Sequence, residues 1–248
     1  MLAIIGGTGL ATLPDLEGTS TRRVATEYGA ADVVEGQLFG QRIVFMPRHG
    51  LPPKLPPHRV NYRANVQALK SLGCQDVIAV TAVGGIDPAL QLGSIVVPHQ
   101  IIDYTWGREH TFHSDHIRHI DFTFPYDQSL RDLILATLAA AGVDRADNGV
   151  YGCTQGPRLE TAAEIERLAR DGCSIVGMTG MPEAALAREA GLRYAGVSVV
   201  VNKAPGIDGE AIDMASIGTA LETGMVDVRR LLRHFVSELG RVPVDLDE

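Results

Sequence analysis

Short apolar runs alternate with segments of helical periodicity along the whole chain. Apolar spacing of about 3.6 residues predicts helices, and runs rich in β-branched residues, several of them apolar throughout, predict strands covered on both faces. This alternation predicts an α/β fold, a single domain over residues 1–248 with a central mixed β-sheet flanked by helices. The expected strands are Leu2–Ile5, Ile43–Met46, Val77–Val80, Ser94–Val97, Ser174–Gly177 and Tyr194–Val201, and the expected helices are Asn61–Leu72, Ser129–Ala141, Thr161–Arg170, Pro182–Ala190 and Ile212–Leu239.

The overall charge narrows the range of partners. The 248 residues include 22 Lys and Arg against 30 Asp and Glu, a formal net charge of −8. This balance argues against a nucleic-acid backbone as the main partner, although an acidic protein can still bind a small anion locally. The three cysteines and eight histidines show no metal-binding spacing, so we expect no metal. We expect no membrane span, because no apolar run approaches ~18 residues. An apolar strand directly after Met1 and an odd cysteine count favour a cytoplasmic protein.

Four turns suited to an anion follow predicted strands. Glycines let the backbone approach an anion closely, and Arg, His and Thr add donors. Each turn has an ordinary alternative, such as a tight turn, an exposed surface pair or a helix cap. Because all four follow the same kind of strand end, where ligands of α/β sheets bind, the set favours a phosphate site. The turns are Gly6-Gly7-Thr8-Gly9, Pro47-Arg48-His49-Gly50, Thr81-Ala82-Val83-Gly84-Gly85 and Gly177-Met178-Thr179.

Two further polar residues are candidates for binding a ligand. Asn202 ends an apolar strand and offers both a donor and an acceptor. Glu160 lies where a loop enters a helix. The alternatives are an amide that only bonds the backbone at the strand end and an ordinary acid in the first helical turn.

Together, these motifs resemble the methylthioadenosine/purine nucleoside phosphorylases of the trimeric class. The resemblance runs in order over essentially the whole chain. It implies a pentosyltransferase that uses inorganic phosphate as co-substrate, without a metal or organic cofactor, and a homotrimer with active sites near the subunit interfaces. The motifs are GGTG, RHG, the segment Val60–Asn65, TAVGG, GMTxxPE and the terminal helix.

The resemblance also implies roles for individual residues. Met178 would lie under the ribose, Leu159 would cover the base, and Val83 with Gly84 would form the wall beside base and sugar. His119 would reach into the 5′ pocket of a neighbouring subunit. The implied phosphate site consists of Thr8, Arg48, His49, Thr81, Ala82 and Thr179.

The base site departs from the adenine-type members, which carry Asp at the positions of Asn202 and Ala204. The Asn-Lys-Ala element here resembles that of the inosine- and guanosine-specific enzymes, and Glu160 matches their acid. Asn202, the candidate catalytic residue, can bond a 6-oxo base and the ring nitrogen of the leaving purine. A buried polar group left unpaired costs about 1–3 kcal/mol, so the wrong base should lose about 5- to 150-fold. We therefore expect a 6-oxopurine.

The 5′ side lacks the histidine that nucleoside enzymes of this class place beyond the Asn element. An apolar stretch stands there instead and suits a methylthio group, although Pro53 replaces a histidine that is frequent in methylthioadenosine relatives. The expected reaction is phosphorolysis of S-methyl-5′-thioinosine to hypoxanthine and 5-methylthioribose 1-phosphate, in purine and methylthio salvage. The apolar residues are Ile207, Ile212, Met214, Ala215 and Ile217.

Several alternatives stay open. A general inosine/guanosine phosphorylase is the first, and a 5′-methylthioadenosine phosphorylase the second. An NAD-dependent oxidoreductase would need the third glycine of the dinucleotide fingerprint, which is missing after Gly7 and Gly9. A non-catalytic nucleoside-binding protein would not need the implied phosphate site.

Overall fold

The computed structural model describes residues 1–209 and 214–239. Its strands are β1 (Leu2–Gly6), β2 (Leu16–Thr26), β3 (Gly29–Leu38), β4 (Gln41–Pro47), β5 (Asp76–Gly85), β6 (Ile95–Asp103), β7 (Arg145–Cys153), β8 (Ile175–Gly177) and β9 (Arg193–Lys203). Its helices are α1 (Tyr62–Ser71), α2 (Gln128–Ala140), α3 (Ala162–Arg170), α4 (Gly180–Glu189) and α5 (Met214–Leu239), with a short 3₁₀ helix over Pro57–Arg59.

Within the described residues, the strands form one mixed sheet in the order β2-β3-β4-β1-β5-β8-β7-β6-β9. An additional pairing of β5 with β9 closes the second half of the sheet into a ring. Strand β1 runs parallel to β4 and β5, and β5 runs parallel to β9. The carboxyl ends of these four strands therefore lie on one side of the molecule.

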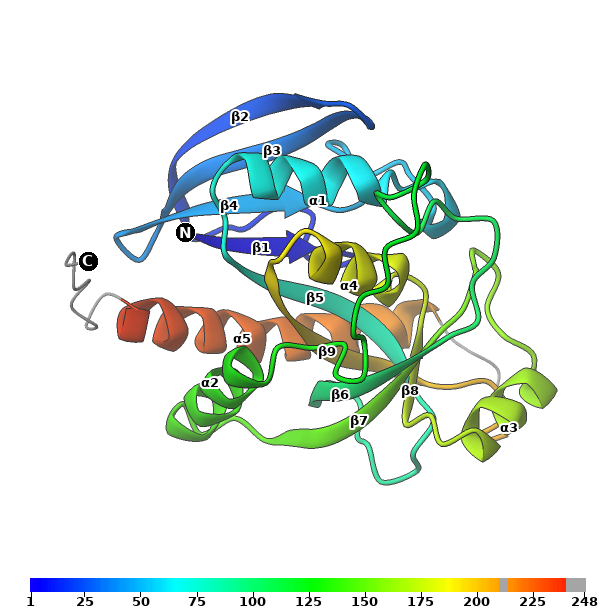
Figure 1. Cartoon of the computed structure of the whole chain (residues 1–248). Coiled ribbons are helices and arrows are strands. Elements are labelled where there is room, and N and C mark those ends of the chain that lie inside the picture. Colours follow the sequence, from blue (N-terminus) through cyan, green and yellow to red (C-terminus); the bar gives the residue numbers. More distant parts are fainter. Residues whose placement is uncertain (210–213, 240–248) are drawn as a thin grey trace.

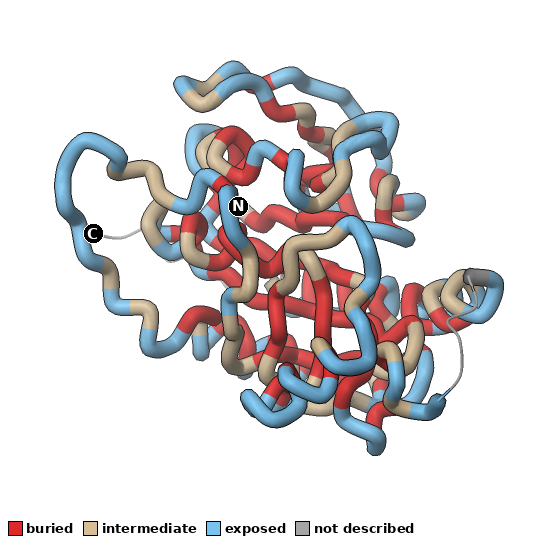
Figure 2. The backbone as a smooth tube through the Cα atoms, turned by 90° about the vertical axis from the view of Figure 1, so that its right-hand side faces the viewer, coloured by how far each residue is buried: buried red, intermediate tan, exposed pale blue. Residues whose placement is uncertain are grey.

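Helices cover both faces of the sheet (Figure 1). Alternate residues of β1 point to opposite faces: Ala3 and Ile5 join a core with α1 and α4, while Leu2 and Ile4 join a core with α2 and α5. Figure 2 shows buried residues concentrated in the central strands and exposed residues in the outer segments. Two-sided burial explains why the central strands are apolar throughout.

The structure confirms the predicted fold class, a mixed sheet flanked by helices. Three strands were not predicted, namely β2, β3 and β7. Strand β2 is largely exposed and polar, and β7 contains Asp147, Asn148 and Gly149, which are poor strand formers. Their strand conformation depends on pairing with neighbours. Ile212 and the terminal segment 242–248, for which we expect a frayed tail, lie outside the described residues. None of the helices in the described part combines the length and the apolar character needed to cross a membrane.

Candidate active site

A cavity of about 180 Å³ lies where the strand ends meet. All predicted site residues except His119 line it, although they come from distant parts of the chain. The other lining residues are Pro57, Val176, Gly177, Val201, Pro205 and Ile217. The predicted residues that line it are Thr8, Arg48, His49, Thr81, Ala82, Val83, Gly84, Leu159, Glu160, Met178, Thr179 and Asn202.

The turn after β1 brings backbone close to a guanidinium. The amide N–H of Leu10 donates to the carbonyl of Gly7 at 3.0 Å, and Gly9 adopts a left-handed φ of 84° that favours glycine. A Cβ atom on Gly7 would lie 2.6 Å from Nη1 of Arg48. Glycine at position 7 therefore allows Arg48 to pack directly against the turn that carries Thr8.

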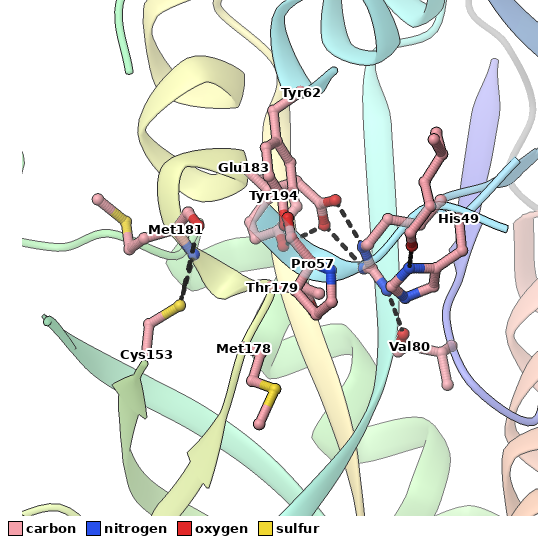
Figure 3. A network of polar contacts seen from close by, with 12 residues as sticks. His49, Pro57, Tyr62, Val80, Cys153, Met178, Thr179, Met181, Glu183 and Tyr194 are labelled. Atoms are coloured by element: carbon pink, nitrogen blue, oxygen red, sulfur yellow. Dashed lines mark hydrogen bonds and ion pairs between the residues drawn. The ribbon is translucent and has the colours of Figure 1, made fainter. Parts of the chain in front are cut away.

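Arg48 is 1% exposed and is held by a carboxylate on its inner side. Its Nε and Nη2 donate to the two carboxylate oxygens of Glu183 at 2.7 and 2.8 Å, and Nη1 donates to the carbonyl of Val80 at 3.0 Å. The hydroxyl of Tyr194 donates to the same carboxylate at 2.9 Å, and Figure 3 shows Glu183 and Tyr194 side by side in this network. Burial would lower the pKa of Arg48, but the charge and hydrogen bonds of Glu183 outweigh it and raise this pKa.

His49 is half-buried beside Arg48, and its Nδ1 lies 2.7 Å from the carbonyl oxygen of Leu55. A carbonyl only accepts, so Nδ1 carries a proton in this contact. Burial lowers the pKa of His49 and the charge of Arg48 acts in the same direction, against the hydrogen bond to Leu55. The imidazole is thus neutral at pH 7, with Nε2 as an acceptor.

Two threonines add hydroxyl groups to the same side of the cavity. Thr81 is buried, and its Oγ1 lies 2.9 Å from Oγ of the buried Ser198. Thr179 occupies the N-cap position of α4 but makes no side-chain capping hydrogen bond, so the alternative of a simple helix cap is wrong. Thr179 follows β8, which runs antiparallel to β5, so it approaches the cavity from a strand of the opposite direction.

The residues predicted for the base line the same cavity, and Asn202 lies farther along β5 than Thr81, because Gly84 pairs with Asn202 and Thr81 pairs with Ser198. Nδ2 of Asn202 donates to the carbonyl of Lys203 at 2.7 Å, which leaves its second N–H and its Oδ1 for a ligand. Glu160 accepts from the hydroxyl of Thr154 at 2.5 Å through one carboxylate oxygen. Leu159, at 44% exposure, forms the outer lip. The hydrogen bond from Asn202 to the backbone fits the alternative of an amide that only bonds the strand end. Asn202 also lines the cavity, so the rest of its amide group is accessible to a ligand.

A buried arginine joins the segments on this side. Arg108 donates to the carbonyls of Met178 and Gln155, both at 2.9 Å, and to the carbonyl of Met181. It also donates to the hydroxyl of Tyr62 at 3.3 Å. Arg108 therefore ties together the segments that carry Gln155, Met178 and Met181.

Some predicted features lie elsewhere. His119 is exposed and does not line the cavity of its own chain. Ile217 lines the cavity, whereas Ile207 packs against a separate apolar cluster. Ala204 is fully buried within that cluster, so its methyl group contacts protein instead of the cavity.

Sequence reasoning missed the residues behind the site. Glu183 lies in the GMTxxPE motif and Arg108 begins a long loop, but neither has a pattern that predicts burial. A charged residue next to a proline at a helix start was the only available signal for Glu183. Ser198 and Tyr194 lie within a predicted strand and gave no polar signal.

Comparisons with known proteins agree with this geometry. A family model described as the phosphorylase superfamily matches residues 1–237. A probable S-methyl-5′-thioinosine phosphorylase of Pseudomonas syringae pv. tomato is 52% identical over 240 residues, covering 95% of this chain and 98% of that protein. A 6-oxopurine nucleoside phosphorylase of Pyrococcus furiosus is 38% identical, covering 93% and 90%.

Among solved structures, methylthioadenosine phosphorylase from Schistosoma mansoni in complex with adenine is similar, with a TM-score of 0.91. It is 31% identical, and the match covers 98% of this chain and 92% of that one. The chain belongs to the phosphorylase superfamily. The predicted class, a pentosyltransferase of the nucleoside phosphorylase type, is confirmed.

Proposed function

We propose that this enzyme cleaves S-methyl-5′-thioinosine with inorganic phosphate, giving hypoxanthine and 5-methylthioribose 1-phosphate. The observation that carries the proposal is one cavity lined by two chemically distinct groups of residues. Anion donors around Arg48 form the first group, and the amide of Asn202 and the carboxylate of Glu160 form the second. The related thioinosine phosphorylase of Pseudomonas syringae supports the choice of substrate.

Phosphate is bound by the side that carries Arg48. Three of the five guanidinium N–H groups are used by Glu183 and Val80, so one N–H on each terminal nitrogen remains for the anion. Two parallel N–H groups suit two oxygens of one phosphate. The hydroxyls of Thr8, Thr81 and Thr179 and the backbone near Ala82 add donors, while Nε2 of His49 accepts a hydrogen bond from a protonated phosphate oxygen.

The reaction needs no covalent intermediate on the protein. A phosphate oxygen forms a bond to the anomeric carbon as the bond from that carbon to purine nitrogen 9 breaks, and its electron pair moves into the purine. The sugar becomes oxocarbenium-like, and the bound phosphate lies against this positive charge. The departing base takes up a proton at ring nitrogen 7, and Oδ1 of Asn202 accepts the hydrogen bond of that N–H, which stabilises the leaving group.

A 6-oxopurine fits the polar groups of the other side. The free N–H of Asn202 donates to the 6-oxo group, and the carboxylate of Glu160 accepts the N–H at ring position 1. A 6-aminopurine presents donors and acceptors in the reverse order and would leave these groups unpaired. Val83, Gly84 and Met178 enclose the sugar and Leu159 covers the base.

Apolar residues define the 5′ end of the substrate. Ile217 lines the cavity without offering a hydrogen bond, so a methylthio group is preferred to a hydroxyl. A general 6-oxopurine nucleoside phosphorylase is the second candidate, because the Pyrococcus furiosus relative carries that name.

The functional unit is a homotrimer in the cytoplasm, and phosphate is its only co-substrate, without a metal or organic cofactor. The loop between β6 and α2 supports contact with another subunit. It exposes Trp106, Ile117 and Phe124 at 72%, 86% and 63%. Trp106 lines a second cavity that shares Glu160 with the site. In the trimer, His119 of this loop reaches a neighbour's 5′ pocket.

A substrate panel tests the proposal. Release of free base is followed from methylthioinosine, methylthioadenosine, inosine and guanosine, each with and without phosphate. We expect phosphate-dependent release that is fastest from methylthioinosine. Equal or faster turnover of inosine would favour the second candidate, and faster turnover of methylthioadenosine would refute the assignment of Asn202 and Glu160.

A further inference from the structure

Glu183 is an unusual residue to find behind a phosphate site, because a carboxylate repels the anion. Its side chain is 1% exposed, and Glu183 does not itself line the cavity. Its partners are Arg48 and the hydroxyl of Tyr194, at 2.9 Å. Burying a carboxylate costs free energy unless it is paired. We therefore consider what this pair does to Arg48.

The pairing fixes the direction in which Arg48 can donate. Glu183 occupies the edge of the guanidinium formed by Nε and Nη2. The remaining N–H of Nη2 must then point away from that edge, towards the Nη1 side. Nη1 itself lies against Gly7. Glu183 therefore leaves only the Nη1–Nη2 edge of the guanidinium for the proposed phosphate, and Arg48 and Thr8 both line the cavity.

The pairing also sets the net charge around Arg48. Arg48 and Glu183 together are neutral, and the lowered pKa of His49 keeps the imidazole uncharged at pH 7. An anion is then held by directed donors more than by net positive charge. A phosphate whose negative charge is not neutralised by the protein interacts more strongly with the positive charge that develops on the sugar.

We infer that Glu183, steadied by Tyr194, is a positioning residue that aims the free edge of Arg48 at the phosphate. The inference rests on the proposed function of this cavity. It predicts that loss of Glu183 affects phosphate and leaves the nucleoside side unchanged. A purely structural role predicts loss of stability with equal effects on both substrates.

The test compares Glu183→Gln with a control at a second arginine–carboxylate pair, whose residues do not line the cavity. Asp76 and Arg193 form this ion pair where β5 and β9 begin, with Nε–Oδ1 at 2.6 Å and a hydrogen bond from Nη2 to Oδ2 at 2.8 Å, and the side chain of Arg193 is 53% exposed. Gln keeps the size of Glu183 but offers only one acceptor oxygen. We expect the KM for phosphate to rise at least tenfold in Glu183→Gln, with the nucleoside KM within twofold, whereas Asp76→Asn changes neither KM.

Binding of phosphate alone provides a readout that does not depend on turnover. Inorganic phosphate should raise the Tm of the wild type and of Asp76→Asn, because a ligand stabilises the state that binds it, and should raise that of Glu183→Gln much less. If Glu183→Gln does not fold, Tyr194→Phe replaces it, with an expected two- to fivefold rise in the phosphate KM.

The outcomes separate the two proposals. An unchanged phosphate KM in the folded variant, or a parallel rise of both KM values, overturns the role of Glu183. Absence of phosphate-dependent base release in the wild type overturns the proposed function instead, whatever the variants do.

Discussion

The two sides of the cavity are built differently. On the proposed phosphate side, Arg48, Glu183, Thr81 and Ser198 are all buried and hydrogen-bonded to other protein groups. On the proposed nucleoside side, Leu159 is exposed and Asn202 and Glu160 are only half-buried. The first group is fixed by contacts within the protein, and the second is more accessible to solvent.

This difference suggests how one fold can serve several nucleosides. Every reaction of this kind uses the same phosphate, so a fixed phosphate site does not restrict the range of nucleosides. The base and the 5′ group vary, and the residues that recognise them can be exchanged without disturbing a buried network. Methylthioinosine, 6-oxopurine and methylthioadenosine enzymes among the similar proteins fit this view.

Replacement of Arg48 should have the largest effect. Arg48→Met removes two charge-assisted hydrogen bonds to phosphate, each worth about 1.5–3 kcal/mol, so kcat/KM for phosphate should fall by about 10²- to 10⁴-fold. It also leaves Glu183 buried without its partner, which costs about 3–5 kcal/mol of unfolding free energy.

A double variant separates these two effects. Arg48→Met with Glu183→Met should recover most of the unfolding free energy in urea titrations but none of the phosphate affinity. Recovery of phosphorolysis in the double variant would show that neither residue belongs to the phosphate side.

Glu160→Gln should act on the nucleoside side alone. Loss of the acceptor for the N–H at ring position 1 costs about 1–3 kcal/mol, a fall of about 5- to 150-fold in kcat/KM for methylthioinosine. Steady-state kinetics should show the phosphate KM within twofold of the wild type. A large rise in that KM would contradict the separation of the two sides. Asn202→Asp alone should shift the preference towards a 6-aminopurine. The second aspartate of the adenine-type members is not added at Ala204, because that position is fully buried.

Ile217→Ser should sharpen the 5′ assignment. Removing about one methylene-sized apolar contact costs about 0.8 kcal/mol, so the preference for methylthioinosine over inosine should fall about fourfold. Ile217→Val keeps an apolar side chain and serves as the control. An unchanged ratio in the serine variant would place the methylthio group elsewhere.

The pH dependence of stability should show the smallest effect. The pKa of His49 is lowered in the folded protein, so its contribution to stability is complete above about pH 6.5 and is lost as the pH falls from there through the folded-state pKa. Urea unfolding of the wild type and His49→Gln at pH 7.5 and 5.0 measures this. The wild type should lose more unfolding free energy on acidification than the variant, and an equal loss would contradict the lowered pKa.

The sequence was sufficient for the fold class and for most of the cavity wall. Apolar strands such as β1 followed by glycine-rich turns are strong local signals, and parallel strands bring their ends together. Polar strands gave no such signal, because β2 and β7 are stabilised by pairing partners that no local pattern identifies.

The supporting residues could not be predicted for a related reason. Glu183 and Arg48 are 135 positions apart, and nothing in either segment indicates that they meet. Burial of a charged side chain is a property of the tertiary structure. Asn202, in contrast, was predictable because it directly follows an apolar run.

A crystal structure with phosphate and hypoxanthine tests the two-sided site most directly. We predict one phosphate ion within hydrogen-bond distance of Thr8, Arg48 and Thr179, with Glu183 still bonded to the far edge of the guanidinium, and hypoxanthine with its carbonyl edge on Asn202 and Glu160. A phosphate bound away from these three residues, or an Arg48 turned away from the ion, would contradict the account.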